Sequence, residues 1–208
     1  MNKSISSSKP RLVIIGAGIV GLTIAREAKL SNKFISIEII EKEKTAGFHA
    51  TSRNSGVIHA GFYYSPESKK GMFCSEGNNL MRKYLLDNSL SYNPCGKVVV
   101  SKNNHEDTII ETLYERGKKN KCNVFLKDAK DLDNYEPCAK TNNLFLWSPN
   151  TWSASPVEVL KCLLNEIKEY GIKIYLNKKI VSAENKYIFL NDGKKIDYDI
   201  LINSAGGY

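Results

Sequence analysis

The feature that most constrains this chain is a β-branched run, residues 11–15, that leads directly into a G-x-G-x-x-G pattern. This order, followed by a helical segment, is typical of the first turn of a dinucleotide-binding βαβ unit. Gly16 permits a sharp turn after the strand, Gly18 permits close approach of backbone to a pyrophosphate, and Gly21 permits the helix to lie close to the sheet. The exposed N–H groups at the helix N-terminus favour phosphate.

A carboxylate follows at the sequence spacing that is typical of such a unit. The second apolar run, residues 37–40, ends at Glu41, twenty positions after Gly21. At the end of that strand a carboxylate can accept hydrogen bonds from ribose hydroxyls. A glycine pattern alone is also compatible with a simple Gly-rich turn, but the order of strand, glycines, helix and acid favours a dinucleotide site.

The remaining patterns alternate between strand and helix. Ser65, Pro66 and Glu67 predict a helix start, with an apolar face at Phe73, Gly77, Leu80, Met81, Tyr84 and Leu85. Further helices are predicted over 105–120 and from the capping box at 155–158 to Gly171. Strands are predicted at 95–100, 124–126, 144–147, 172–176, 187–190, 194–198 and 199–203. The last of these has the continuous apolar pattern of a parallel strand covered on both faces.

This order predicts an α/β fold in which a Rossmann-like sheet is interrupted by an inserted β/α unit. We expect residues 1–10 to be disordered, residues 11–90 to form the first part of the nucleotide-binding domain, and residues 91–153 to form the insertion. Residues 154–208 would then return to the first domain, with the 187–198 hairpin as a small cover beside the main sheet.

Composition excludes several classes of protein. The net charge of +8 comes from dispersed lysines without a basic block, which favours a solvated surface over a nucleic-acid groove. The five cysteines form no C-x-x-C pair, which disfavours a disulfide framework and a metal site and is typical of a reducing compartment. The N-terminus lacks the apolar core of a signal peptide, and no apolar run has the length of a membrane span. A cytoplasmic protein is expected.

Three segments carry a resemblance to a known family. They are the glycine pattern, the loop at residues 49–64 and the closing segment at residues 203–206. Together they resemble the FAD-dependent oxidoreductases of the D-amino-acid oxidase superfamily, and within it the branch of L-2-hydroxyglutarate oxidases and dehydrogenases. The most specific part is the run from Asn54 to Ser68, and the resemblance extends over nearly the whole chain from Arg11.

The resemblance implies FAD as the cofactor and assigns roles to individual residues. Gly16, Gly18 and Gly21 would approach its pyrophosphate, and Glu41, with the adjacent Lys42, would bind the adenosine end. Residues implied on the flavin side of the cofactor are Ser52, Arg53, Asn54 and Ser55. Backbone at Val181 would meet the adenine, and Ala205 and Gly206 would close over the phosphates and ribitol.

His59 is the candidate catalytic residue. In some relatives a histidine in a similar loop lies beside the flavin ring, and in a few it bonds covalently to the ring. A histidine that is only hydrogen-bonded inside a Gly-rich turn is the structural alternative. His49 and His105 are expected at the surface without chemistry, Arg82 and Arg116 are expected to be solvated, and no metal site is expected.

The sequence departs from the branch in two places. After Trp147, residues 150–155 do not have the Thr-Gly-Ile-Val-Asp-like turn of the branch, and Trp152 in this segment could either line a substrate pocket or anchor the inserted unit. Family members also continue well past residue 208, so the resemblance implies a C-terminally truncated chain that lacks the last flavin motif and is inactive alone.

Three functions remain open at this stage. The first is FAD-dependent oxidation of a small 2-hydroxy acid, similar to L-2-hydroxyglutarate, by hydride transfer to the flavin. The second is oxidation of an amine or amino acid, and the third is a non-catalytic nucleotide-binding fragment. The expected partner is a small carboxylate substrate, with no nucleic acid and no transmembrane segment. The sequence does not indicate the electron acceptor, and peripheral attachment to a membrane is also open.

Overall fold

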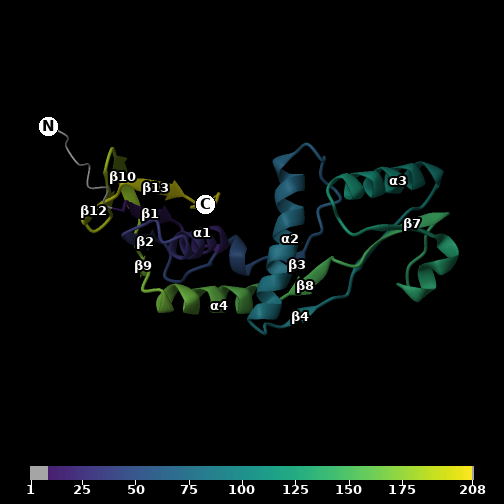
Figure 1. Ribbon diagram of the computed structural model, residues 1–208, viewed down its shortest axis with the longest axis horizontal. Helices are drawn as coiled ribbons and strands as arrows, with labels where there is room; N and C mark the ends of the chain where they lie inside the picture. Colours follow the sequence, from purple (N-terminus) through teal and green to yellow (C-terminus); the bar gives the residue numbers. More distant parts are fainter. Residues whose placement is uncertain (1–8, 208) are drawn as a thin grey trace. The chain divides into compact units, whose positions relative to one another are not determined.

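The computed structural model describes residues 9–207 and divides them into two compact units (Figure 1). The first unit comprises residues 9–54 and 156–207, and the second comprises Ser55–Ser155. Most of the segment predicted to be disordered, residues 1–8, lies outside the described residues. The second unit begins at residue 55, whereas the insertion was predicted to begin at residue 91. The strand at residues 57–58 pairs with residues 152–154, which also pair with residues 92–93, so this early segment belongs to a sheet of the second unit.

The centre of the first unit is a four-stranded parallel sheet in the order β13-β1-β2-β9. Its strands are β1 (Arg11–Ile15), β2 (Ser36–Ile40), β9 (Lys173–Tyr175) and β13 (Ile200–Asn203). Strands β1 and β2 pair with Leu12 opposite Ile37, and β13 returns from the far end of the chain to place Asn203 opposite Ile15. The predicted α/β class with a parallel sheet is confirmed.

Two helices and a short 3-10 turn accompany this sheet. They are α1 (Ile19–Leu30), α4 (Pro156–Glu169) and η1 (Ala50–Ser52). Helix α1 lies against β2 and contacts α4, where Arg26 and Glu166 form an ion pair. Helix α4 begins at Pro156 as predicted, and Gly171 follows its end with a φ of +69°, the left-handed conformation that glycine adopts without a Cβ penalty.

A small antiparallel sheet covers one face of the parallel sheet. Its strands are β10 (Ile180–Glu184), β11 (Tyr187–Leu190) and β12 (Lys195–Asp197). Ile188, Leu190 and Ile196 pack in one cluster with Val13 of β1 and Ile40 of β2. The predicted hairpin around Gly193 is therefore present, and it covers the sheet as expected.

The second unit contains two three-stranded sheets and two long helices. One sheet has the order β3-β8-β4, and the other has the order β5-β7-β6 with α3 packed on it. The elements are β3 (Val57–Ile58), α2 (Lys69–Asp87), β4 (Tyr92–Asn93), β5 (Lys97–Val100), α3 (Asn104–Lys119), β6 (Phe125–Asp128), η2 (Ala129–Asn134), β7 (Leu144–Ser148) and β8 (Trp152–Ala154). Phe62, Ile110 and Leu146 lie in its core.

Three predictions of local structure were wrong. Helix α2 begins at Lys69, because Ser65 accepts the Ser68 N–H in a turn and the Ser68 hydroxyl caps the helix through the Gly71 N–H at 3.0 Å. Phe73 and Leu80 of its predicted apolar face are 60% and 61% exposed. Strand β13 is parallel as predicted but is an edge strand within the described residues, and Ile200 at its start is exposed.

A buried carboxylate joins two loops of the second unit. Asp107, in the first turn of α3, accepts hydrogen bonds from the Ser101 hydroxyl and from the side-chain amides of Asn142 and Asn143, at 2.7 and 2.8 Å for the amides. These bonds lower the pKa of Asp107, and the Ser101 hydroxyl makes the largest contribution. The ionised carboxylate thus connects the start of α3 to the loop before β7.

We predict that Asp107→Ala lowers the melting temperature by several degrees, because it leaves three donors without their acceptor. A lowered folded-state pKa means that the ionised form contributes stability above the unfolded pKa, which is about 3.9. That contribution is lost as the pH falls through the folded pKa. Urea unfolding at pH 7 and at successively lower pH should show the difference between wild type and Asp107→Asn shrinking as the carboxylate becomes protonated. A difference that is independent of pH would contradict this account.

Candidate functional site

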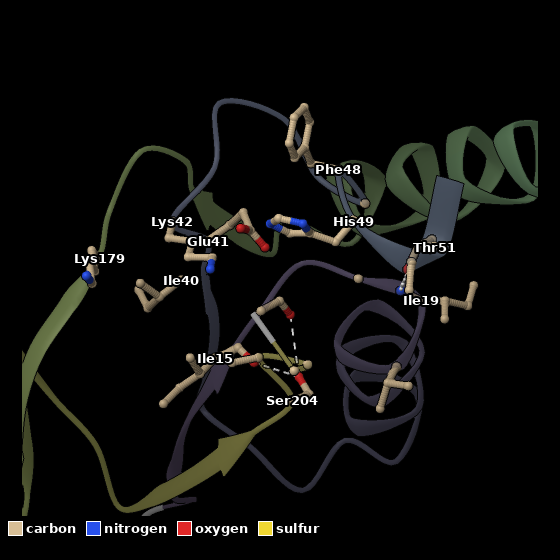
Figure 2. Close-up of a pocket in the computed structure, with 18 of the residues that line it drawn as sticks. Ile15, Ile19, Ile40, Glu41, Lys42, Phe48, His49, Thr51, Lys179 and Ser204 are labelled. Carbon is tan, nitrogen blue, oxygen red and sulfur yellow. Dashed lines mark hydrogen bonds between the residues drawn. The ribbon is translucent and has the colours of Figure 1, made fainter. Parts of the chain in front are cut away.

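A cavity of about 430 Å³ opens in the first unit at the carboxyl ends of β1, β2 and β13. Ligands of open parallel α/β sheets bind at this end of the strands. The lining residues that matter below are Gly16, Gly18, Glu41, Lys42, His49, Thr51, Asn54, Lys178, Lys179, Ile180, Ser204, Ala205 and Gly206 (Figure 2). All of them belong to the first unit, so this cavity is formed without any residue of the second.

The floor of the cavity is a turn in which the backbone packs too closely for side chains. Gly16 has a φ of +98°, and a Cβ on it would lie 2.5 Å from the carbonyl oxygen of Ser204. A Cβ on Gly21 would lie 2.0 Å from the carbonyl oxygen of Gly16. Ser204 stabilises the turn, because its hydroxyl donates to the Ile15 carbonyl at 2.7 Å. The glycine pattern therefore brings α1, β1 and the segment after β13 together.

The N-terminus of α1 faces this turn without an acidic side chain. Gly18 is its N-cap residue and supplies no side-chain cap, and the first turn contains no acidic residue. Thr51, from η1, accepts a hydrogen bond from the Ile19 N–H at 3.0 Å. The positive end of the helix dipole is thus uncompensated by any carboxylate of that turn, which suits an anion.

We predict that Thr51→Val lowers the melting temperature by about 2–4 °C, because the Ile19 N–H loses its acceptor at a typical cost of about 1 kcal/mol. Valine has nearly the same shape, so packing against Gly18 is preserved. Thr51→Ser keeps the hydroxyl and is the matched control. Thermal unfolding followed by circular dichroism measures both variants, and equal melting temperatures for valine and serine would contradict the role of Thr51 as a cap.

Glu41 lies at the cavity wall with only 8% of its surface exposed. Its Oε2 accepts the Ala17 N–H at 2.7 Å, and its Oε1 accepts the Glu43 N–H at 2.9 Å. A carboxylate oxygen can accept about two hydrogen bonds, so each oxygen retains capacity for one more donor. The side chain is therefore oriented by backbone on both sides of the cavity while it remains able to accept from hydroxyl groups.

Lysines supply positive charge around the cavity. Lys42 follows Glu41 and lies 4.0 Å from the Glu43 carboxylate, and Lys178 and Lys179 come from the segment before β10. Lys178 pairs with Asp192, and the hydrogen bond from its ammonium lowers the pKa of that carboxyl. Positive side chains around a cavity raise the local concentration of an anionic ligand.

The structure brings seven of the predicted site residues to the cavity lining. These are Gly16, Gly18, Glu41, Lys42, Asn54, Ala205 and Gly206. Four other predicted residues of the first unit do not line it. Gly21 lies beneath the turn, Val181 is 62% exposed, Ser52 donates its N–H to the Gly47 carbonyl, and Arg53 lies over the Phe48 ring at 4.5 Å. The adjacent residues Lys179 and Ile180 line the cavity where Val181 was predicted.

Ser55 and His59 belong to the second unit. Both side chains are exposed, and the His59 carbonyl accepts from the Asn78 side chain at 3.2 Å and from the Cys74 thiol at 3.4 Å. Asn78 is buried and also donates to the Asn150 carbonyl at 2.8 Å. The backbone around His59 is thus fixed by α2, and a role of its imidazole beside a flavin stays a prediction.

His49 was not among the predicted site residues. It was expected at the surface, but its imidazole lines the cavity and its Nε2 lies 2.8 Å from Oε1 of Glu43. Its position six residues after Glu43, in a segment without periodicity, offers no pattern that sequence analysis could use. Phe48, whose ring meets the imidazole edge-on at 5.2 Å, was missed for the same reason.

In the second unit, Trp152 is stacked on Tyr92 with ring centroids 4.9 Å apart, and the guanidinium of Arg82 lies 5.1 Å from its ring. Arg82 also donates to the Asn78 and Asn79 side chains at 2.9 and 2.7 Å, so the expectation that it is only solvated was wrong. These contacts favour the anchoring role of Trp152 over a role as a pocket wall.

The cavity fits the adenosine diphosphate part of a dinucleotide. The glycine turn brings backbone without side chains to the edge of the cavity, the α1 N-terminus offers backbone donors to phosphate, and Glu41 offers acceptors to a ribose. Ala205 and Gly206 follow β13 at the same edge, and open space lies where a Cβ of Gly206 would point.

Comparison with known proteins defines the class. Residues 11–208 match the model of the DAO family, described as FAD dependent oxidoreductase, and the chain belongs to this family. FAD, predicted from the sequence, is the cofactor of this class. The fold agrees, because the chain superposes with a TM-score of 0.81 on L-proline dehydrogenase from P. horikoshii, at 24% identity over 95% of this chain and 53% of that one.

Within the family, the chain is similar to L-2-hydroxyglutarate dehydrogenases named as mitochondrial. It is 41% identical to that of Mus musculus over 93% of this chain and 42% of the relative. It is 32% identical to that of Caenorhabditis briggsae over 99% of this chain and 46% of the relative. The chain thus spans less than half the length of these relatives. The names of the relatives differ from the cytoplasmic expectation, and among residues 9–207 no helix combines the length and apolarity needed to cross a bilayer.

Proposed function

We propose that this chain contributes the adenosine-binding part of an FAD-dependent enzyme that oxidises a small 2-hydroxy acid, of the type of L-2-hydroxyglutarate. The observation that carries the proposal is the identity of 32–41% with L-2-hydroxyglutarate dehydrogenases across most of the chain. The cavity adds physical support, because its turn, helix terminus and carboxylate match the chemistry of an adenosine diphosphate moiety.

Different residues of the cavity would contact different parts of FAD. Backbone N–H groups at Gly18 and the start of α1, together with Ala205 and Gly206, would contact the pyrophosphate. Glu41 would accept from the adenosine ribose, with Lys42 beside it, and the segment Lys178–Ile180 with the adjacent Val181 would border the adenine. Ser52, Arg53, Asn54, Ser55 and His59 remain candidates for the flavin side, with Asn54 the one that lines the cavity.

FAD supplies the two-electron acceptor for the hydride that leaves the substrate carbon bearing the hydroxyl. The residues described here bind and orient the remote adenosine end of the cofactor. Such remote contacts fix the position of the reacting ring and reduce the entropy lost on reaching the reactive geometry.

The experiment is reconstitution of the purified chain with FAD, followed by anaerobic addition of candidate substrates to the reconstituted protein. Binding should shift and quench the flavin spectrum, and L-2-hydroxyglutarate should bleach the flavin absorbance. Bleaching by sarcosine or D-alanine alone would favour oxidation of amines. A folded chain that takes up no FAD would favour a non-catalytic fragment.

A further inference from the structure

His49 is an ionisable side chain at the cavity to which neither the sequence patterns nor the family description assigns a role. Its imidazole is partly buried, with 31% of the side chain exposed, and Figure 2 shows it among the labelled side chains around the cavity, with Glu41 and Thr51. Its Nε2 lies 2.8 Å from Oε1 of Glu43. The Lys42 ammonium lies 4.0 Å from the same oxygen, which is too long for a hydrogen bond.

Glu43 connects this contact to Glu41. The Glu43 N–H donates to Oε1 of Glu41 at 2.9 Å, and the Glu43 carbonyl accepts the Asn177 N–H at 2.9 Å. The position of residue 43 therefore determines where one of the two donors to the Glu41 carboxylate lies. His49 joins the side chain of that residue to the far end of the 43–49 loop.

The loop has one more attachment at the glycine turn. The Gly47 N–H donates to the Ala17 carbonyl at 2.9 Å, and the Ala17 N–H donates to Oε2 of Glu41 at 2.7 Å. The 41–49 segment is therefore connected to the glycine turn by hydrogen bonds at both ends. One oxygen of Glu41 accepts from Ala17 and the other accepts from Glu43. A carboxylate held in this way presents its remaining acceptor sites in a defined direction, which is the condition for selecting a diol.

We infer that His49 is a positioning residue for ribose selection: through Glu43 it orients the Glu41 carboxylate toward the 2′- and 3′-hydroxyls of the adenosine ribose. The ligand class that this arrangement selects is an adenine ribonucleotide diphosphate over its 2′-deoxy counterpart. The inference rests on the proposed function, since it assumes that the cavity binds the adenosine diphosphate part of FAD.

The selectivity follows from the cost of an unpaired acceptor. A 2′-deoxy ligand leaves one acceptor site of a buried carboxylate without a donor, and hydrogen bonds to charged groups typically change affinity by about tenfold or more. Loss of the His49 contact leaves the Ala17 N–H bond to Glu41 in place but allows residue 43, the second donor to Glu41, to move. The ratio of the two affinities should therefore fall while affinity for the diphosphate is largely retained.

The test measures the dissociation constants of ADP and 2′-deoxy-ADP for the full chain by isothermal titration calorimetry. We expect wild type to prefer ADP by about tenfold, His49→Leu to reduce that preference to about twofold or less, and His49→Gln, which keeps an N–H donor for Glu43, to restore most of it. His105→Leu removes an exposed histidine of α3 and is the matched control. Melting temperatures of all variants report whether folding is intact.

The outcomes separate the two proposals. If folded wild type binds neither nucleotide, the proposed function fails. If wild type prefers ADP and His49→Leu keeps the same preference, the positioning role of His49 is overturned while the proposed function stands. If His49→Leu unfolds, His49→Gln and Glu43→Leu provide the measurement. The first should keep the preference, and the second, which has no acceptor for His49, should lose it; any other pattern would contradict the inference.

Discussion

The Gly21→Ala variant is expected to have a strongly destabilised first unit. A Cβ at this position would lie 2.0 Å from the Gly16 carbonyl oxygen and 2.9 Å from the Ser204 hydroxyl. The first of these atoms is backbone of the glycine turn, so the added methyl can be accommodated only by moving α1 away from β1. We expect a destabilisation of about 3 kcal/mol and loss of measurable FAD binding.

Gly77→Ala is the matched control for this experiment. Gly77 also lies inside a helix, α2, but among the described residues no atom beyond its chain neighbours and the adjacent helix backbone lies within 4 Å of the place where its Cβ would be. Alanine there should stabilise the protein by about 0.5–1 kcal/mol through helix propensity. Denaturant unfolding of both variants provides the comparison. Equal effects of the two substitutions would show that the close approach of α1 to the glycine turn does not exist.

The Glu41→Gln variant is expected to lower the affinity for FAD by roughly 10–100-fold, the range for hydrogen bonds to a charged acceptor. The carboxylate accepts the Ala17 and Glu43 N–H groups, one on each oxygen. The substitution replaces one of these oxygens by an NH₂ group, which is itself a donor and cannot accept from the N–H group that faces it. It also removes the charge that attracts the ribose hydroxyls. The effect should appear in the FAD dissociation constant more than in the melting temperature.

Fluorescence titration of flavin quenching measures this effect. Glu27→Gln is a suitable control, since Glu27 lies on α1 with its side chain 67% exposed and does not line the cavity. An unchanged dissociation constant for Glu41→Gln, with wild-type behaviour of Glu27→Gln, would mean that Glu41 serves only the turn. The ribose would then have to bind elsewhere in the cavity.

The parts of the fold that sequence patterns predicted are those with strong local signals. The run at 11–15, the glycines and Glu41 form a unit in which each residue type has one function, and the structure places β1, α1 and β2 there. The start of α4 at Pro156 and the left-handed Gly171 after its end are also local signals.

The parts that failed depend on contacts distant in sequence or on competing local choices. Ser65 and Ser68 are both suitable N-cap residues. Ser68 is the one used, because its hydroxyl accepts the Gly71 N–H. Strands β3 and β4 are two residues long and exist because β8 pairs with both of them. The exposure of Phe73 and Leu80 cannot be read from helical period, which predicts that residues share a face but not what covers that face.

The candidate site shows the same division. Glycines and the strand-end acid are predictable because the ligand imposes their spacing. His49 is not, because its partner Glu43 and their shared loop have no repeating pattern. The backbone contact predicted for Val181 stays a prediction; the residues just before it, Lys179 and Ile180, line the cavity.

Mapping the nucleotide contact by amide chemical shifts is the most direct measurement of the central claim, that the glycine turn and Glu41 bind one adenosine diphosphate moiety. On addition of ADP to the isotopically labelled chain, we predict that the largest shifts lie in residues 16–20, 41–42, 178–180 and 204–207. Saturable binding whose largest shifts fall in Ser55–Ser155, or no binding by the folded chain, would contradict the account.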